Sequence, residues 1–161
     1  MIQKQDLLQL LTKEFATTQK VIRAFPEDKL DFAPHERSQN AGRLMSTFVF
    51  EIYLLAAYVL GEKVERERFQ NYKPESINKV LSDFNGEGKR VMAAIENMKD
   101  EELESKEIKF ANHTFTADRF IMMMLSDQIH HRGQLSVYVR MAGGKVPSIY
   151  GPSGDDPTTN F

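Results

Sequence analysis

The sequence contains no cysteine among its 161 residues, which excludes disulfide bonds, thiolate metal ligands and a cysteine nucleophile. It also has no excess of basic residues, because 21 lysines and arginines stand against 23 aspartates and glutamates and the net charge is −2. A protein that follows a phosphate backbone needs a basic surface. We therefore expect no nucleic-acid partner.

Long apolar runs and targeting signals are absent as well. The longest apolar-looking stretch, residues 48–60, is interrupted by Glu51 and is shorter than the roughly 20 residues that span a bilayer. The N-terminus lacks the basic-then-apolar pattern of a signal peptide, and the absence of cysteine agrees with a reducing compartment. We expect a cytoplasmic protein without a membrane segment.

The residues that are present suit one folded domain over residues 1–161. Hydrophobic residues make up 41% of the chain and charged residues 27%, which is enough to build a core with a soluble surface. Apolar side chains recur at spacings of three and four, which predicts amphipathic helices at residues 7–25, 40–61, 76–98 and 117–141. Breaking or capping residues mark their ends, namely Pro26, Ser38 or Asn40, Gly61, Ser76 and Thr116.

Four helices of this length predict an all-α fold, a four-helix bundle with a long crossover connection and an extended C-terminal tail. Residues 62–73 are charged and loop-like, and they are long enough to cross the bundle. The charged run 99–107 ends the third helix, and residues 108–115 fit either a short hairpin or an irregular loop. The tail, residues 145–161, should pack on the body, and we expect Arg132 to tie down the tail or a loop by ion pairing.

The last predicted helix carries the residues of greatest chemical interest. Helical spacing places Asp127 and His131 one turn apart on one face, where a carboxylate and an imidazole can hold one divalent cation. A third ligand must come from another helix. Glu51 is the candidate, because a charge on the most apolar helix is costly unless it is paired or bound to a metal. Such a set favours Mn, Fe or Mg relative to Cu or Ni and leaves Zn open.

A structural interpretation of the same residues stays open, and spacing alone favours it. Asp127 and His131 would then form a hydrogen-bonded pair, with Glu51 accepting from a neighbour and His130 pointing at solvent or at a partner subunit. In an enzyme, His130 or Tyr138 would be the group that moves protons. The three methionines 122–124 fit core filling before they fit a ligand groove.

At its C-terminal end the chain resembles the DinB-like superfamily. The residues that carry the resemblance are HHRGQL at 130–135, VYVR at 137–140 and GGKVP at 143–147, and the continuation SIYGPS is similar to the tail of one branch. The resemblance implies a four-helix bundle, commonly a homodimer, with a divalent metal held by three histidines. His131 matches one of these histidines, and Asp127 falls where a second would be. The third position falls at about Thr47, with Glu51 one turn further on.

The resemblance leads to two hypotheses. The first is a divalent-metal-dependent enzyme of hydrolase or thiol-dependent transferase type that acts on a small-molecule substrate. Its ion would be held by Glu51, Asp127 and His131, and the sequence does not distinguish among Zn, Ni, Mn and Fe. The concentration of these three residues favours a surviving, altered site over a decayed one. The alternative is a non-catalytic dimeric bundle, a binding or stress-response protein with an altered or relic metal site.

Overall fold

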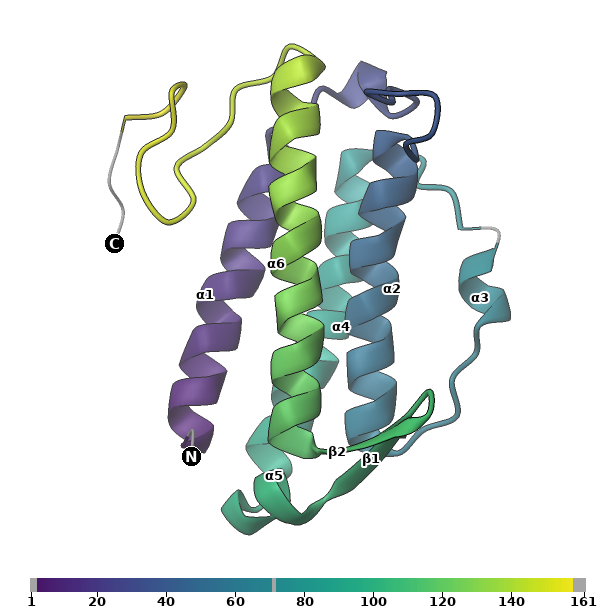
Figure 1. The fold of residues 1–161 in the computed structure, drawn as a ribbon, viewed down its shortest axis with the longest axis vertical. Coiled ribbons are helices and arrows are strands. Elements are labelled where there is room, and N and C mark those ends of the chain that lie inside the picture. The colour runs from purple at the N-terminus through teal and green to yellow at the C-terminus, as the bar shows by residue number, and fades with distance from the viewer. Residues whose placement is uncertain (1–2, 71, 158–161) are drawn as a thin grey trace.

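Four long helices form the body of the protein in a computed structural model that describes residues 3–70 and 72–157 (Figure 1). They are α1 (Lys4–Arg23), α2 (Ala41–Leu60), α4 (Ile77–Asn97) and α6 (Ala117–Met141). Both α1 and α2 pack against α4 and α6, so that each long helix has two long neighbours. The predicted all-α four-helix bundle is confirmed, and the four predicted helices are present with boundaries shifted by a few residues at most.

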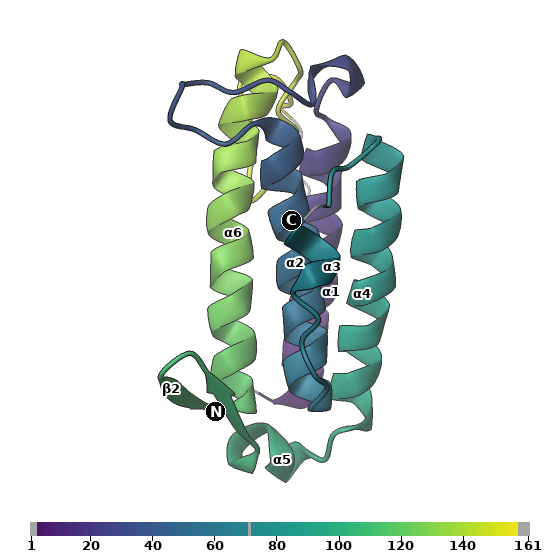
Figure 2. The ribbon, with the colours of Figure 1, turned by 90° about the vertical axis from the view of Figure 1, so that its right-hand side faces the viewer.

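The chain order is not a simple up-and-down order. In Figure 1, α1 runs upward and α2 runs downward, and the connection after α2 returns along the outside of the bundle, so that α4 also runs downward. The view in Figure 2 shows this connection beside α2 and α4. The predicted long crossover is therefore present. Its loop-like character is only partly correct, because a short helix, α3 (Glu67–Gln70), lies within it.

Short elements close the lower end of the bundle. The charged run after α4 was expected only to end that helix, but it forms a separate helix, α5 (Asp100–Ser105). The strands β1 (Glu107–Phe110) and β2 (His113–Thr116) follow as an antiparallel hairpin, which decides between the two predicted alternatives. At the other end, a 3-10 turn, η1 (Glu27–Lys29), lies between α1 and α2.

Local sequence explains where α2 begins and ends. The side chain of Asn40 accepts a hydrogen bond from the backbone N–H of Arg43 at 2.8 Å, so Asn40 rather than Ser38 is the N-cap. Gly61 follows the last turn with a φ of 75°, a conformation that glycine adopts without the steric cost of a Cβ atom. These two residues fix the length of the helix that carries Glu51.

The α2 helix is the apolar centre of the bundle. By length and composition it could cross a bilayer, but 72% of its 18-residue apolar window is buried inside the protein. The apolar helix is therefore longer than residues 48–60, the stretch that the sequence argument considered, but its burial indicates a core helix and no membrane span. Burial against α4 and α6 accounts for the apolar character of the helix.

The C-terminal tail folds back beside α1 and α6 (Figure 1). Arg132 is almost fully buried and donates to Glu14 Oε2 at 2.6 Å and to Thr18 Oγ1 at 3.3 Å. Tyr150 of the tail accepts from Arg132 and donates to Glu14 Oε2 at 2.8 Å. The expected role of Arg132 as an anchor of the tail is thus observed for the described residues, while residues 158–161 of the predicted tail lie outside them.

Candidate metal centre

Three side chains from two helices meet between α2 and α6. Glu51 comes from the middle of α2, and Asp127 and His131 stand one turn apart on α6. His131 Nε2 lies 3.2 Å from Glu51 Oε1 and 3.7 Å from Asp127 Oδ1. One ligand atom from each residue can be chosen so that all three lie within 4.8 Å of one another, which is close enough to hold one metal ion. The structure therefore brings together the three residues that the sequence singled out.

Glu51 is the electrostatically unusual member of this triad. It is only 5% exposed, and its Oε2 atom is buried without a hydrogen-bond partner among the described residues. Burial, followed by the negative charge of Asp127 and a hydrogen bond with it, raises the pKa of Glu51 to about 9. The Glu51 carboxyl group is consequently protonated at neutral pH when no cation is close to it.

His131 is oriented from its other side. Its Nδ1 atom lies 2.9 Å from Gln134 Oε1, and Gln134 Nε2 lies 3.0 Å from His130 Nε2. An amide oxygen can only accept, so His131 donates from Nδ1 and keeps the lone pair of Nε2 directed at Glu51 and Asp127. The Phe48 ring packs edge-on against the imidazole at a centroid distance of 6.4 Å, which restricts its rotation. This tautomer is the one that a metal ligand through Nε2 requires.

The donor set fits a divalent cation. A buried polar atom without a partner is rare and costly, and Glu51 Oε2 would gain a partner if a cation lay between the three side chains. A nearby dication would also favour the ionised carboxylate, reversing the effect of burial on the pKa of Glu51. Asp127 has a side chain that is 55% exposed, so the triad is open to solvent on that side.

A groove of about 730 Å³ opens beside the triad. Five apolar side chains line it together with the triad, His130, Thr47 and Ser126, and these five are Phe50, Leu54, Phe110, Met123 and Met124. Phe110 comes from the hairpin, whereas the others come from α2 and α6. The expectation that methionines 122–124 fit core filling is confirmed, because Met124 belongs to the buried core and Met122 and Met123 pack against it. Met123 and Met124 in addition form part of the wall of this groove.

Tyr138 and Thr47, two residues considered for the site, have hydroxyl groups that donate to backbone carbonyl oxygens and do not point to the triad as ligands. The Tyr138 hydroxyl donates to the carbonyl oxygen of Gln39 at 3.0 Å, and Tyr138 is not among the residues that line the groove. Thr47 lines the groove, but its hydroxyl donates to the carbonyl oxygen of Arg43 at 3.3 Å within α2. His130 also lines the groove, although its Nε2 atom is engaged by Gln134. Of the two predicted proton-moving candidates, only His130 is close to the triad.

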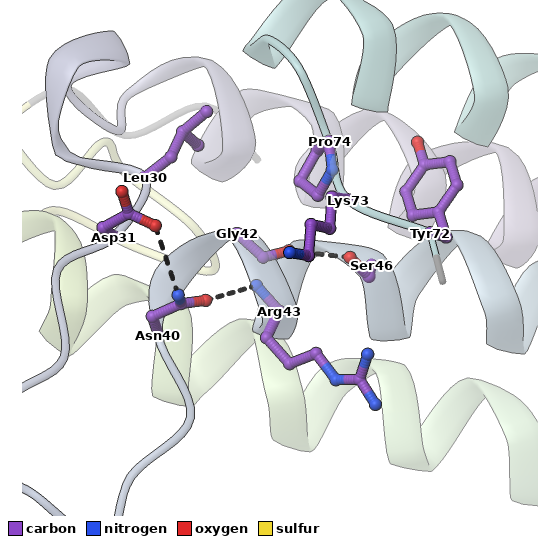
Figure 3. Close-up of a pocket in the computed structure, with 9 residues that line it drawn as sticks. All are labelled: Leu30, Asp31, Asn40, Gly42, Arg43, Ser46, Tyr72, Lys73 and Pro74. Carbon is purple, nitrogen blue, oxygen red and sulfur yellow. Dashed lines mark hydrogen bonds between the residues drawn. The ribbon is translucent and has the colours of Figure 1, made fainter. Parts of the chain in front are cut away.

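A second, polar cleft of about 350 Å³ lies at the N-terminal end of α2, away from the triad (Figure 3). Arg43 and Lys73 supply its positive charges, and Asp31 and Asn40 face each other across its other side. The first backbone N–H groups of α2 are already bonded, since Ala41 donates to Phe32 and Gly42 donates to Leu30, both at 2.8 Å. This cleft therefore lacks the free helix N–H groups that hold anions.

Sequence reasoning missed two parts of the site. The first is Gln134, whose bridging of His130 and His131 was not anticipated. The signal was its spacing, four residues after His130 and three after His131, which brings side chains together on a helix. The contribution of Phe110 had no such signal, because it depends on how the hairpin packs.

Comparisons with known proteins agree with this architecture. A family model described as DinB family matches residues 1–160. The chain is 22% identical over 144 residues to the uncharacterized protein YrdA of Bacillus subtilis (strain 168), covering 89% of this chain and 85% of the relative. It is also similar to the solved structure of a DinB-like protein from Bacillus cereus ATCC 10987, with a TM-score of 0.80 and 22% identity over 91% of this chain and 97% of the other.

A second solved structure, the DinB-like protein YjoA from Bacillus subtilis, has a TM-score of 0.66 and 21% identity over 85% of this chain and 91% of the other. At these identities the two solved structures support the fold alone. The family model covers nearly the whole chain. That chain folds as a helical bundle with a long crossover and a tail that folds back on it. The chain belongs to the DinB family.

Proposed function

We propose that this protein is a divalent-metal-dependent enzyme of hydrolase or thiol-dependent transferase type, with Glu51, Asp127 and His131 as its metal ligands. The observation that carries the proposal is the buried carboxyl group of Glu51, whose Oε2 atom has no partner among the described residues and whose Oε1 atom faces His131 Nε2. A carboxyl group in this position costs stability unless a cation compensates it.

Each residue of the site has a distinct part in this proposal. The bound ion would act as a Lewis acid and lower the pKa of a water molecule or thiol. Glu51 and Asp127 balance the two positive charges of the ion, and Gln134 holds the His131 lone pair toward it. His130, at the wall of the groove, is the side chain placed to exchange a proton with a bound substrate. Oxygen-rich ligands favour Mn, Fe or Mg and are compatible with Zn.

Metal binding tests the proposal directly. The protein is purified without a histidine tag, stripped with a chelator and titrated calorimetrically with Mn²⁺, Zn²⁺, Ni²⁺ and Fe²⁺. We expect one ion per chain and a loss of affinity of about ten-fold or more in Glu51→Gln and His131→Ala, as deletion of a ligand requires. Glu96→Gln, a matched change of an exposed glutamate on α4, serves as the control. Substoichiometric metal under every supplement, with no thermal shift, would remove the proposal.

The alternative is a non-catalytic bundle with a relic site. Under it, Asp127→Ala and His131→Ala would change stability only modestly and would affect no ligand. The homodimer and the small-molecule substrate that the resemblance implies belong to our proposal as well. Sedimentation velocity of the metal-free protein tests the dimer independently of metal binding.

A further inference from the structure

The groove beside the triad has a composition that restricts what it can bind. We infer that it takes an uncharged, apolar small molecule, whose body lies between Phe50, Phe110 and Met123 and whose polar end reaches the triad. This inference rests on the proposed function and names the substrate class of the same site. A volume of about 730 Å³ is that of a groove for a small molecule.

The charges along the groove oppose an anionic ligand. The carboxyl groups that line it are those of Glu51 and Asp127, and none of the described lining residues is a lysine or an arginine. When both carboxylates hold a divalent ion, their charges cancel those of the ion. The body of a negatively charged molecule would therefore find no counter-ion. The polar cleft with Arg43 and Lys73 offers the opposite chemistry and lies elsewhere (Figure 3).

The hydroxyl groups in the groove are already engaged within their own helices. Ser126 donates to the carbonyl oxygen of Met122 at 2.8 Å, and Thr47 donates to that of Arg43 at 3.3 Å. Gln134 occupies the Nε2 atom of His130. Polar recognition is thus concentrated at the triad and at the second ring nitrogen of His130, Nδ1, while the rest of the wall offers apolar contact.

The aromatic walls are held in place by other aromatic rings. Phe50 packs against Phe69 at a centroid distance of 5.2 Å and stacks on Tyr53 at 6.5 Å. Phe110, which comes from the hairpin, meets Tyr58 and Phe120, both at a centroid distance of 5.5 Å. Walls that are already packed lose little conformational entropy on binding, so they favour a flat or compact apolar body that fits between them.

Methionine-methyl NMR of the metal-free protein tests the inference without relying on a bound ion. The probes are benzyl alcohol and benzoate, which are similar in size and differ in charge. We expect benzyl alcohol to shift the methyl signals of Met123 and Met124 while leaving the exposed Met141 unchanged. Benzoate should bind about ten-fold more weakly or not at all, a ratio that corresponds to about 1.4 kcal/mol.

Two variants localise the binding. Phe110→Ala should weaken binding of benzyl alcohol, whereas Leu60→Ala, a change of an exposed apolar residue on the same bundle that does not line the groove, should not. Equal binding of benzoate would overturn the inference. Shifts at Met141 equal to those at Met123 and Met124 would also overturn it. The same holds if the Met123 and Met124 signals depend on protein concentration alone, because a second copy of the chain would then cover the groove.

A parallel titration with Mn²⁺ separates this inference from the proposed function. Paramagnetic broadening of the Met124 signal without any response to benzyl alcohol would leave the metal site standing and overturn the inferred substrate class. A response to benzyl alcohol without broadening by Mn²⁺ or a calorimetric signal for any divalent ion would overturn the proposed function while supporting an apolar binding groove.

Discussion

Replacing Glu51 with glutamine should stabilise the metal-free protein at neutral pH and weaken its metal binding by about ten-fold or more. The pKa of Glu51 rises from 4.5 to about 9 because of burial and then the charge of Asp127. At pH 7 the folded protein keeps the proton that the unfolded chain releases, and this release favours unfolding. At 1.36 kcal/mol per pH unit between 4.5 and 7, the cost at pH 7 is about 3 kcal/mol.

The pH dependence distinguishes this cause from a packing effect. The folded state binds more protons than the unfolded state between pH 4.5 and about 9, so wild-type stability should fall as the pH rises through that window. Glutamine does not titrate, so the variant should lack this slope. The difference in free energy of unfolding should be near zero at pH 4.5 and reach about 3 kcal/mol at pH 7.

Urea unfolding in the presence of a chelator measures this difference at each pH. Glu96→Gln, which changes an exposed glutamate, should show no such pH-dependent gain. Added Mn²⁺ should reverse the order, because an ion that binds only the folded wild type stabilises it. A gain for Glu51→Gln that is the same at every pH, or a loss at pH 8 without metal, would refute the reasoning.

Three further predictions concern the residues around the site. Arg132→Met leaves the carboxylate of Glu14 buried without its ion pair and should lower the free energy of unfolding by about 3–5 kcal/mol in urea, and a loss under 1 kcal/mol would contradict it. Gln134→Leu should weaken the metal affinity by about 10–100-fold, whereas Gln134→Glu keeps the acceptor for His131 Nδ1 and should retain the affinity. Equal metal affinity of the two variants would exclude the orienting role of Gln134. A hydrogen bond from Arg140, and after it one from the backbone N–H of Val146, lowers the pKa of Asp155 below 3.8. The stabilisation by Asp155 should therefore be present above pH 3.8 and disappear as the pH falls through the lowered pKa. Melting temperatures of Asp155→Asn and wild type should therefore converge in acid, and a constant gap would contradict this.

The sequence predicted the long helices because each contains several turns of apolar periodicity and a recognisable end. Asn40, Gly61 and Ser76 are residues whose capping preference is local, and all three cap as expected. The helices α3 and α5 span only four and six residues, so they contain too few turns for periodicity to show. The four-residue strands of the hairpin left two alternatives open for the same reason.

The candidate site was predictable as far as it depends on helix spacing. Asp127 and His131 follow from their four-residue separation, and Glu51 follows from the cost of a lone charge on an apolar helix. Tyr138 shares that face in projection, but seven residues beyond His131 correspond to about 10 Å along the helix. Its hydroxyl accordingly reaches Gln39 instead. Contacts between elements, such as Phe110 at the groove, depend on packing that no local pattern encodes.

The cost of Glu51 also bears on the choice between a working and a relic site. A protein that had lost its metal would carry a buried carboxyl group that lowers its stability by about 3 kcal/mol at pH 7, a large fraction of the total stability of an ordinary domain. One substitution to glutamine, isosteric and uncharged, would remove that cost. The neighbouring groups are also compatible with the proposed ligand set, since His131 directs its Nε2 atom at Glu51 while its Nδ1 atom is held by Gln134. We therefore favour the working site proposed above over the relic site, because function can offset a stability cost that a relic site would carry without benefit.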